Sequence, residues 1–87
     1  MRAEDILNDS QNHVERDGVV IRKGSVGAFL ANATIWCDQT ATSEQRQRAE
    51  RDMRALLPGL RAIGLFDVFS IRDEALRTLI DTHYPTT

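Results

Sequence analysis

The first clear pattern in the sequence is a set of apolar residues at the three- and four-residue spacing of one helical face. It starts after Gly24, and Ser25 is well suited to cap the helix. The pattern predicts a helix that ends near Cys37 or Asp38 and turns these side chains inward: Val26, Phe29, Leu30, Ala33 and Trp36. Ile35 and Cys37 widen the apolar stripe, so we expect the helix to be buried over much of its surface.

Two further helical patterns follow. Thr42 with Gln45, or Ser43 as the cap, predicts a helix start of the capping-box type. The inward positions of this second helix are Ala49, Met53, Leu56, Leu57, Leu60 and Ile63. Pro58 lies inside the pattern, so the helix is predicted to kink or break there, with a short continuation that ends at Gly64. The last pattern consists of a Ser70 cap followed by Ile71, Ala75, Leu76, Leu79 and Ile80.

The residues ahead of these helices favour extended structure. Asp17-Gly18 lies between β-favouring segments, which is a strong short-range signal for a β-hairpin. The next three residues, Val19, Val20 and Ile21, are β-branched and stiff. We therefore predict an α+β fold dominated by helix, with an N-terminal β-hairpin packed on about three helices. The chain is expected to be one domain over 1–87, with 1–13 either a short first helix or a flexible end, and 84–87 a tail.

Composition and charge are those of an ordinary small globular domain. The chain has 87 residues, of which 41% are hydrophobic and 28% charged. No apolar run reaches the roughly 20 residues that a membrane span needs, and the acidic start lacks the apolar stretch of a secretory signal. We therefore expect a cytoplasmic protein without a membrane segment. The formal net charge of −2 argues against nucleic acid as the main partner.

No residue pattern predicts a catalytic or metal site. His13, Cys37 and His83 are the strongest nitrogen and sulfur ligands in the sequence, and no two of them share a short ligand spacing. Cys37 is expected to be an inert, buried thiol near the C-terminal end of its helix, where the helix dipole raises a thiol pKa. We therefore expect no enzymatic activity, no cofactor and no metal.

The segment that most suggests ligand binding precedes the first long helix. It combines basic side chains, glycines and a serine: Arg22, Lys23, Gly24, Ser25 and Gly27. Free N–H groups at a helix N-terminus attract anions, so a phosphate or carboxylate is one candidate ligand. The spacing does not match a phosphate-binding P-loop. A turn at Gly24 followed by a Ser25 cap explains the same residues without any ligand.

A second alternative is a nucleic-acid-binding regulator that uses the second helix. This helix and its continuation carry five arginines: Arg46, Arg48, Arg51, Arg54 and Arg61. The last three fall near one face, which suits contact with a phosphate backbone. Acidic residues are interleaved, however, and Glu50 between Arg46 and Arg54 favours a self-compensated helix surface.

Two runs of residues give the sequence a family resemblance. They are Asp17-Gly18 with the run from Lys23 to Asn32, and Leu57-Pro58-Gly59-Leu60 with the run from Ile63 to Phe69. Over residues 17–69 the sequence resembles a small bacterial family of uncharacterised proteins, a domain of unknown function. That family has no assigned activity, so the resemblance implies no functional residue.

The leading hypothesis is a small, non-enzymatic protein-interaction module that self-associates as a homo-oligomer or docks on a protein partner. It rests on a small core, a hairpin with open edges and more large apolar residues than a short helix bundle hides. Aromatic residues at helical spacing are more often core than binding surface, but an exposed one would anchor an interface. The candidate interface residues are Val19, Val20, Ile21, Trp36, Phe66 and Phe69.

Overall fold

The first long helix is α2 (Ser25–Cys37) in the computed structural model, which describes residues 13–16 and 18–85. It begins after Gly24, whose φ of 85° is left-handed and therefore suits glycine. The predicted end near Cys37 or Asp38 is confirmed. The predicted Ser25 cap is wrong, because Ser25 already lies inside the helix and its hydroxyl donates to the carbonyl oxygen of Arg22 at 2.7 Å.

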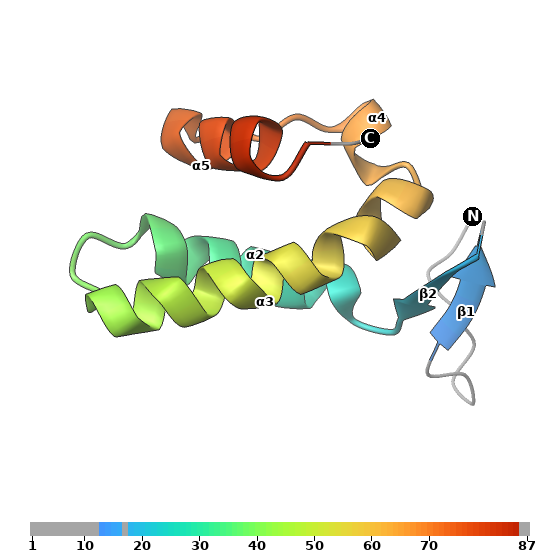
Figure 1. The fold of residues 1–87 in the computed structure, drawn as a ribbon, viewed down its shortest axis with the longest axis horizontal. Coiled ribbons are helices and arrows are strands. Elements are labelled where there is room, and N and C mark those ends of the chain that lie inside the picture. The colour runs from blue at the N-terminus through green and yellow to red at the C-terminus, as the bar shows by residue number, and fades with distance from the viewer. Residues whose placement is uncertain (1–12, 17, 86–87) are drawn as a thin grey trace.

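The longest helix, α3 (Ser43–Ala62), packs alongside α2 (Figure 1). Its predicted capping box is confirmed: the Thr42 hydroxyl accepts from the Gln45 N–H, and the Gln45 side chain accepts from the Thr42 N–H. Of the predicted kink or break at Pro58, the break does not occur, since the helix continues to Ala62. Figure 1 shows the last turns of α3 bending away from the line of the rest of the helix. Leu57 and Leu60 are both buried on either side of the proline, and their packing outweighs the lost hydrogen bond.

The C-terminal part of the described chain is built from three short helical segments. These are α4 (Leu65–Val68), α5 (Glu74–Thr78) and η1 (Leu79–His83), which continues α5 with wider turns. Gly64, at a φ of 80°, separates α3 from α4 as predicted. The predicted Ser70 cap is wrong: Asp73 caps α5 by accepting from the Leu76 N–H at 2.9 Å. Aspartate caps as well as serine does, and residues 69–73 remain outside any helix.

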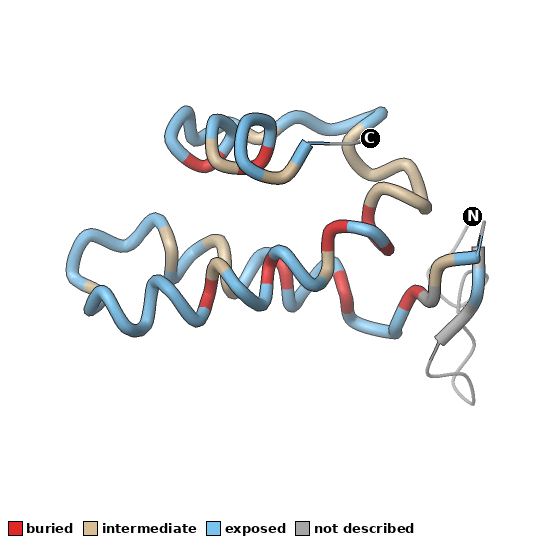
Figure 2. The backbone as a smooth tube through the Cα atoms, in the orientation of Figure 1, coloured by how far each residue is buried: buried red, intermediate tan, exposed pale blue. Residues whose placement is uncertain are grey.

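The core lies between the helices. Its buried cluster consists of Phe29, Met53, Leu57, Leu60, Leu76 and Ile80. These residues come from α2, α3, α5 and η1, so that helices meet only helices at the centre. Figure 2 shows the buried positions spaced at intervals along tubes that are otherwise exposed or half-buried. Such a thin core leaves much apolar side-chain surface near the solvent.

The predicted α+β class, with a hairpin packed on about three helices, is wrong: over the residues that the structure describes, the chain is a mostly helical globule of about four helices, with η1 counted as the continuation of α5. Two strands, β1 (His13–Arg16) and β2 (Val19–Arg22), run antiparallel beside the end of α3. Among their described side chains only Ile21 is buried, and the core cluster contains no strand residue. Two four-residue strands build no sheet on which helices pack. Residues 1–12, most of the predicted first helix or flexible end, lie outside the described residues.

Candidate protein-interaction surface

An apolar groove runs along α2, between this helix and the segment that joins α4 to α5. Its volume is about 440 Å³. The side chains that define it are Phe29, Phe66 and Leu76, which are buried or half-buried, and Val26, Leu30 and Phe69, which are exposed. We call the surface made by these six residues the α2 groove.

The apolar side chains at the mouth of the α2 groove are strongly exposed. Leu30 exposes 60% of its surface and Phe69 exposes 64%, while Val26 exposes 39%. One exposed leucine is ordinary on a soluble domain. Three large apolar residues around one hollow form a contiguous patch instead, and such patches are typical of contact sites for other molecules.

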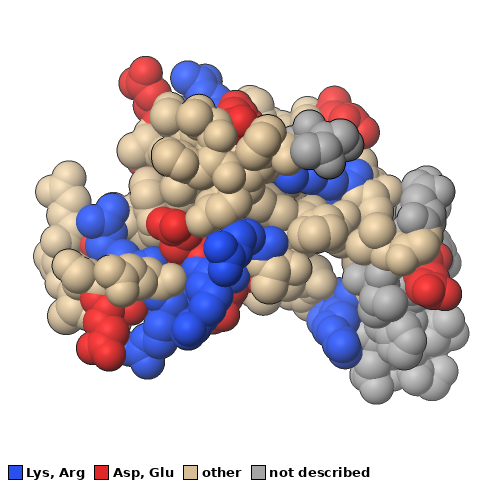
Figure 3. Space-filling view, in the orientation of Figure 1, with Lys and Arg blue, Asp and Glu red and all other residues tan. Residues whose placement is uncertain are grey.

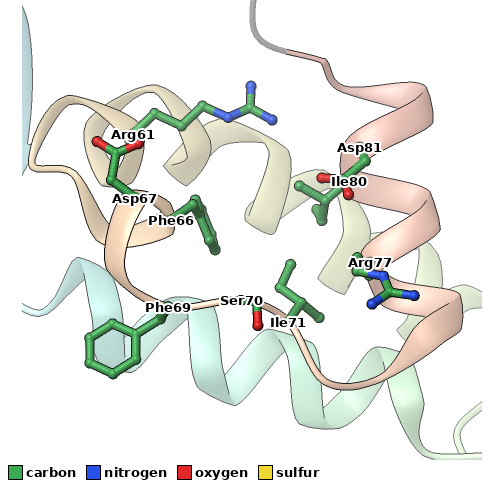
Figure 4. A pocket seen from close by; sticks show the side chains of 9 residues that line it. All are labelled: Arg61, Phe66, Asp67, Phe69, Ser70, Ile71, Arg77, Ile80 and Asp81. Atoms are coloured by element: carbon green, nitrogen blue, oxygen red, sulfur yellow. The ribbon is translucent and has the colours of Figure 1, made fainter.

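The exposure of Phe69 follows from where α4 ends. The Phe69 N–H still donates to the Leu65 carbonyl oxygen at 2.9 Å, but its own backbone is extended, at φ −112° and ψ 145°. The chain therefore leaves the helix at Phe69, and the ring is not drawn into the core. Figure 4 shows this ring apart from the side chain of Phe66.

The base of the α2 groove is aromatic. The rings of Phe29 and Phe66 lie edge to face, with centroids 5.8 Å apart and an interplanar angle of 68°. This is a favourable geometry for an aromatic pair, and it joins α2 to α4. The groove therefore has a fixed base and an exposed aromatic side chain, Phe69, beside it.

Two charged residues of opposite sign, Arg72 and Asp73, stand at the rim of the α2 groove. Both are exposed, and they are the charged members among the described residues that line the groove. The lining is thus electrically balanced. It favours neither a strongly acidic nor a strongly basic ligand.

The groove continues along α2 to Cys37, because a neighbouring hollow shares Leu30, Ala33 and Asp73 with it and reaches the thiol. Cys37 is exposed, so the prediction of a buried thiol is wrong. The pKa of the thiol is raised, first by partial burial and then by the charge and hydrogen bond of Asp73, with Arg46 opposing. The predicted direction of the shift is confirmed, although its causes differ from the helix dipole. A raised pKa leaves little nucleophilic thiolate near neutral pH.

Replacing Asp73 with asparagine is expected to speed alkylation of Cys37 by iodoacetamide at pH 8 roughly two- to fivefold, because a lower thiol pKa gives more thiolate. Asparagine caps a helix as well as aspartate does, so α5 is preserved. Asp81→Asn, which removes an exposed carboxylate that does not act on Cys37, is the control. An alkylation rate that is unchanged in Asp73→Asn would contradict the contact between the two residues.

A second hollow, of about 370 Å³, lies on the other side of the segment that carries Phe69 (Figure 4). It shares part of its wall with the α2 groove, namely Phe66, Phe69, Ser70 and Ile71. Its charged lining residues are two arginines and two aspartates: Arg61, Asp67, Arg77 and Asp81. The Arg61 guanidinium donates to the carbonyl oxygen of Tyr84, so it already has a hydrogen-bond partner within the fold. This balanced polar hollow selects no ligand class.

The clearest polar cluster joins α2, α3 and the end of the described chain. The two carboxylate oxygens of Glu50 accept from Trp36 Nε1 at 3.3 Å and from Tyr84 Oη at 2.7 Å. The Arg46 guanidinium lies 5.1 Å from the centre of the Trp36 ring, and that of Arg54 lies 5.8 Å from the Tyr84 ring. Each group has a partner within the fold, so this cluster fastens helices together and is not a ligand site.

The predicted anion-binding residues line none of the three hollows described above. Arg22, Lys23, Gly24 and Gly27 are exposed at the start of α2. Ser25 is buried, and its hydroxyl is already bonded to the Arg22 carbonyl oxygen. Anion binding at this helix start stays a prediction.

The predicted arginine face of α3 is divided in the structure. Arg54 lies over the ring of Tyr84 and Arg61 donates to the Tyr84 carbonyl oxygen. Arg51 and Arg54 are exposed, whereas Arg61 is half-buried. Figure 3 shows acidic atoms interleaved with the arginines over α3. Nucleic-acid binding stays a hypothesis, and the distribution of charge does not favour it.

The predicted interface residues are scattered over the structure. Phe66 and Phe69 line the α2 groove. Trp36 is half-buried and donates to Glu50. In β2, Val19 is half-buried and Ile21 is buried. The side chain of Val20 lies outside the described part. Sequence reasoning missed Val26 and Leu30, which it assigned to the core. The available signal was that apolar residues extend around most of α2 instead of forming one stripe.

Within residues 13–16 and 18–85, no three His, Cys, Asp or Glu side chains gather where they can hold a metal ion. In the same part of the chain, no helix combines the length and apolar character needed to cross a bilayer. Comparisons with protein-family models, with curated proteins and with solved structures find no match to this chain.

Proposed function

We propose that this chain is a non-enzymatic protein-interaction module whose contact surface is the α2 groove. The observation that carries the proposal is the exposure of Leu30 and Phe69, which both line one apolar hollow. Moving a leucine or phenylalanine side chain out of water is favourable by about 1.5–3 kcal/mol. A few such residues, placed together, supply most of the binding energy in typical protein interfaces.

The lining of the α2 groove suits a protein better than a small molecule. Small-molecule sites place a few convergent polar groups among apolar walls, and these groups fix the ligand's orientation. In the α2 groove, the polar lining residues Ser70, Arg72 and Asp73 belong to the exposed segment at its edge. Cys37, the thiol in the neighbouring hollow, has a raised pKa, which does not favour covalent catalysis there.

Hydroxyl-radical footprinting tests whether the α2 groove is covered when the protein functions. In cells that express the chain, we expect Leu30 and Phe69 to be oxidised roughly threefold or more slowly than in the isolated, highly diluted chain, because a partner excludes water from hot-spot residues. Ile35 is the control, since it is a large exposed apolar residue of α2 that lies outside the α2 groove. Equal oxidation of Phe69 in the two samples would contradict the proposal.

A further inference from the structure

We infer that the occupant of the α2 groove is a second copy of this chain, in a two-fold symmetric dimer in which each Phe69 enters the groove of the other protomer. The inference rests on the proposed function, because it names the partner for the same surface. Shape, charge and the aromatic base of the groove each support a second copy.

The shape of this surface is self-complementary. In a two-fold interface the same patch occurs on both protomers, so a protrusion on the patch must match a hollow on that patch. Phe69 is exposed and stands at the edge of the groove that Val26 and Leu30 line. In the dimer that we infer, one two-fold rotation places each Phe69 ring against the hollow of the other protomer. A partner of another shape has no such relation to the Phe69 side chain.

The rim charges also match a second copy. Arg72 and Asp73 are adjacent, exposed and opposite in sign, and they line the α2 groove. If the two-fold axis passes beside this rim, the rim segments of the two protomers run antiparallel. Arg72 of each protomer then lies towards the other protomer's Asp73, so like charges do not face each other. An acidic or a basic peptide would meet an unfavourable charge at the same rim.

The aromatic base gives the entering ring a favourable site. Phe29 and Phe66 already lie edge to face at 5.8 Å, and a third ring that packs on them adds aromatic contacts at the same range of distances. Val26, Leu30 and Phe69 are exposed large apolar residues at this one site, so the dimer covers apolar surface that the monomer leaves in water. A small domain with a thin core gains more from such burial than a large one does.

Sedimentation equilibrium of the full chain over a hundredfold or wider concentration range tests the inference. We expect the molar mass to rise from 9.8 kDa towards twice that value as concentration increases. Phe69→Asp is expected to raise the dimer Kd at least roughly thirtyfold, the effect of losing an interface hot spot. Ile35→Asp, an equally disruptive change on exposed α2 surface outside the groove, is expected to leave the Kd unchanged. Far-ultraviolet circular dichroism verifies that both variants are folded.

Two results overturn the inference. The first is a monomer at every concentration up to about 1 mM, the weakest affinity worth considering for such an interface. The second is a dimer with the same Kd in Phe69→Asp and the parent chain, since its interface must then lie elsewhere. A monomer combined with protection of Phe69 in cells leaves the proposed function standing with another protein as partner. Equal oxidation of Phe69 in cells and in isolation removes the proposed function itself.

Discussion

Replacing Leu60 with alanine is expected to lower the free energy of unfolding by about 2–5 kcal/mol, the cost of a cavity left by a buried leucine. Leu60 is fully buried in α3, and it belongs to the cluster in which α2, α3, α5 and η1 meet. A domain of this length is stabilised by roughly 4–13 kcal/mol in total. The variant therefore loses a large part of its stability, which urea unfolding followed by circular dichroism measures.

Leu30→Ala is the matched control for Leu60→Ala, because it makes the same chemical change at an exposed position of α2. At concentrations that keep the chain monomeric, we expect it to change the free energy of unfolding by less than about 0.5 kcal/mol. Comparable losses in the two variants would show that Leu30 is buried in the monomer, against the structure. A negligible loss in Leu60→Ala would contradict the helical core instead.

Features that depend on a few neighbouring residues could be predicted from the sequence. The capping box at Thr42 and Gln45 uses residues three apart, and both of its hydrogen bonds form. The left-handed residue after α3 is predicted by Gly64 alone. Local signals also misled where two of them competed: Ser70 and Asp73 are both good caps, and packing of the intervening segment over the core decides for Asp73.

Local signals did not decide the fold class or the continuity of α3 through Pro58, because tertiary packing decided both. Val19 and its β-branched neighbours do favour extended backbone. Whether extended backbone makes a fold α+β depends on further strands, and the described chain has none beyond the pair β1 and β2. Burial of Leu57 and Leu60 likewise carries α3 through the proline. Neither outcome is visible within a few residues of the sequence.

The candidate site was harder to predict than the fold, because exposure depends on how many elements surround a helix. Spacing placed Val26 and Leu30 with Phe29 on one face of α2. In the structure α2 packs on α3 and near α5, and this arrangement covers Phe29 but not Leu30. Phe69 was among the predicted interface residues, yet its exposure depends on where α4 ends. A periodic pattern predicts which residues share a face, but not how many neighbours cover that face.

Glu50→Gln is expected to destabilise the chain by about 1–2 kcal/mol, because it weakens two hydrogen bonds that a carboxylate accepts. In the neutral amide one of the two accepting oxygens is replaced by an NH2 group, which donates and cannot accept, so Trp36 and Tyr84 no longer each have a charged acceptor. The partners of Glu50 lie 14 and 34 residues away in the sequence, and they join α2 and the C-terminal end to α3. Glu44→Gln, an exposed change in the first turn of the same helix, is the control, with an expected loss below about 0.5 kcal/mol.

The pH dependence of Tyr84 shows whether that loss comes from the Glu50 contact. The pKa of Tyr84 is raised, first by its hydrogen bond to Glu50 and then by burial and the Glu50 charge, while Arg54 opposes. The folded chain thus binds the phenol proton more tightly than the unfolded chain, in which tyrosine titrates near pH 10. Stabilisation from this proton is complete below about pH 10 and is lost as the pH rises through the raised pKa.

The chain has one tyrosine, so the ultraviolet absorbance of tyrosinate reports on Tyr84 alone. In Glu50→Gln, we expect this titration to move to lower pH, towards the ordinary value near 10. The stability difference between the variant and the parent chain should then narrow above about pH 10, because the parent loses the stabilisation that the variant already lacks. A titration that does not move would mean that the hydroxyl of Tyr84 has another acceptor in solution, and that the destabilisation arises at Trp36.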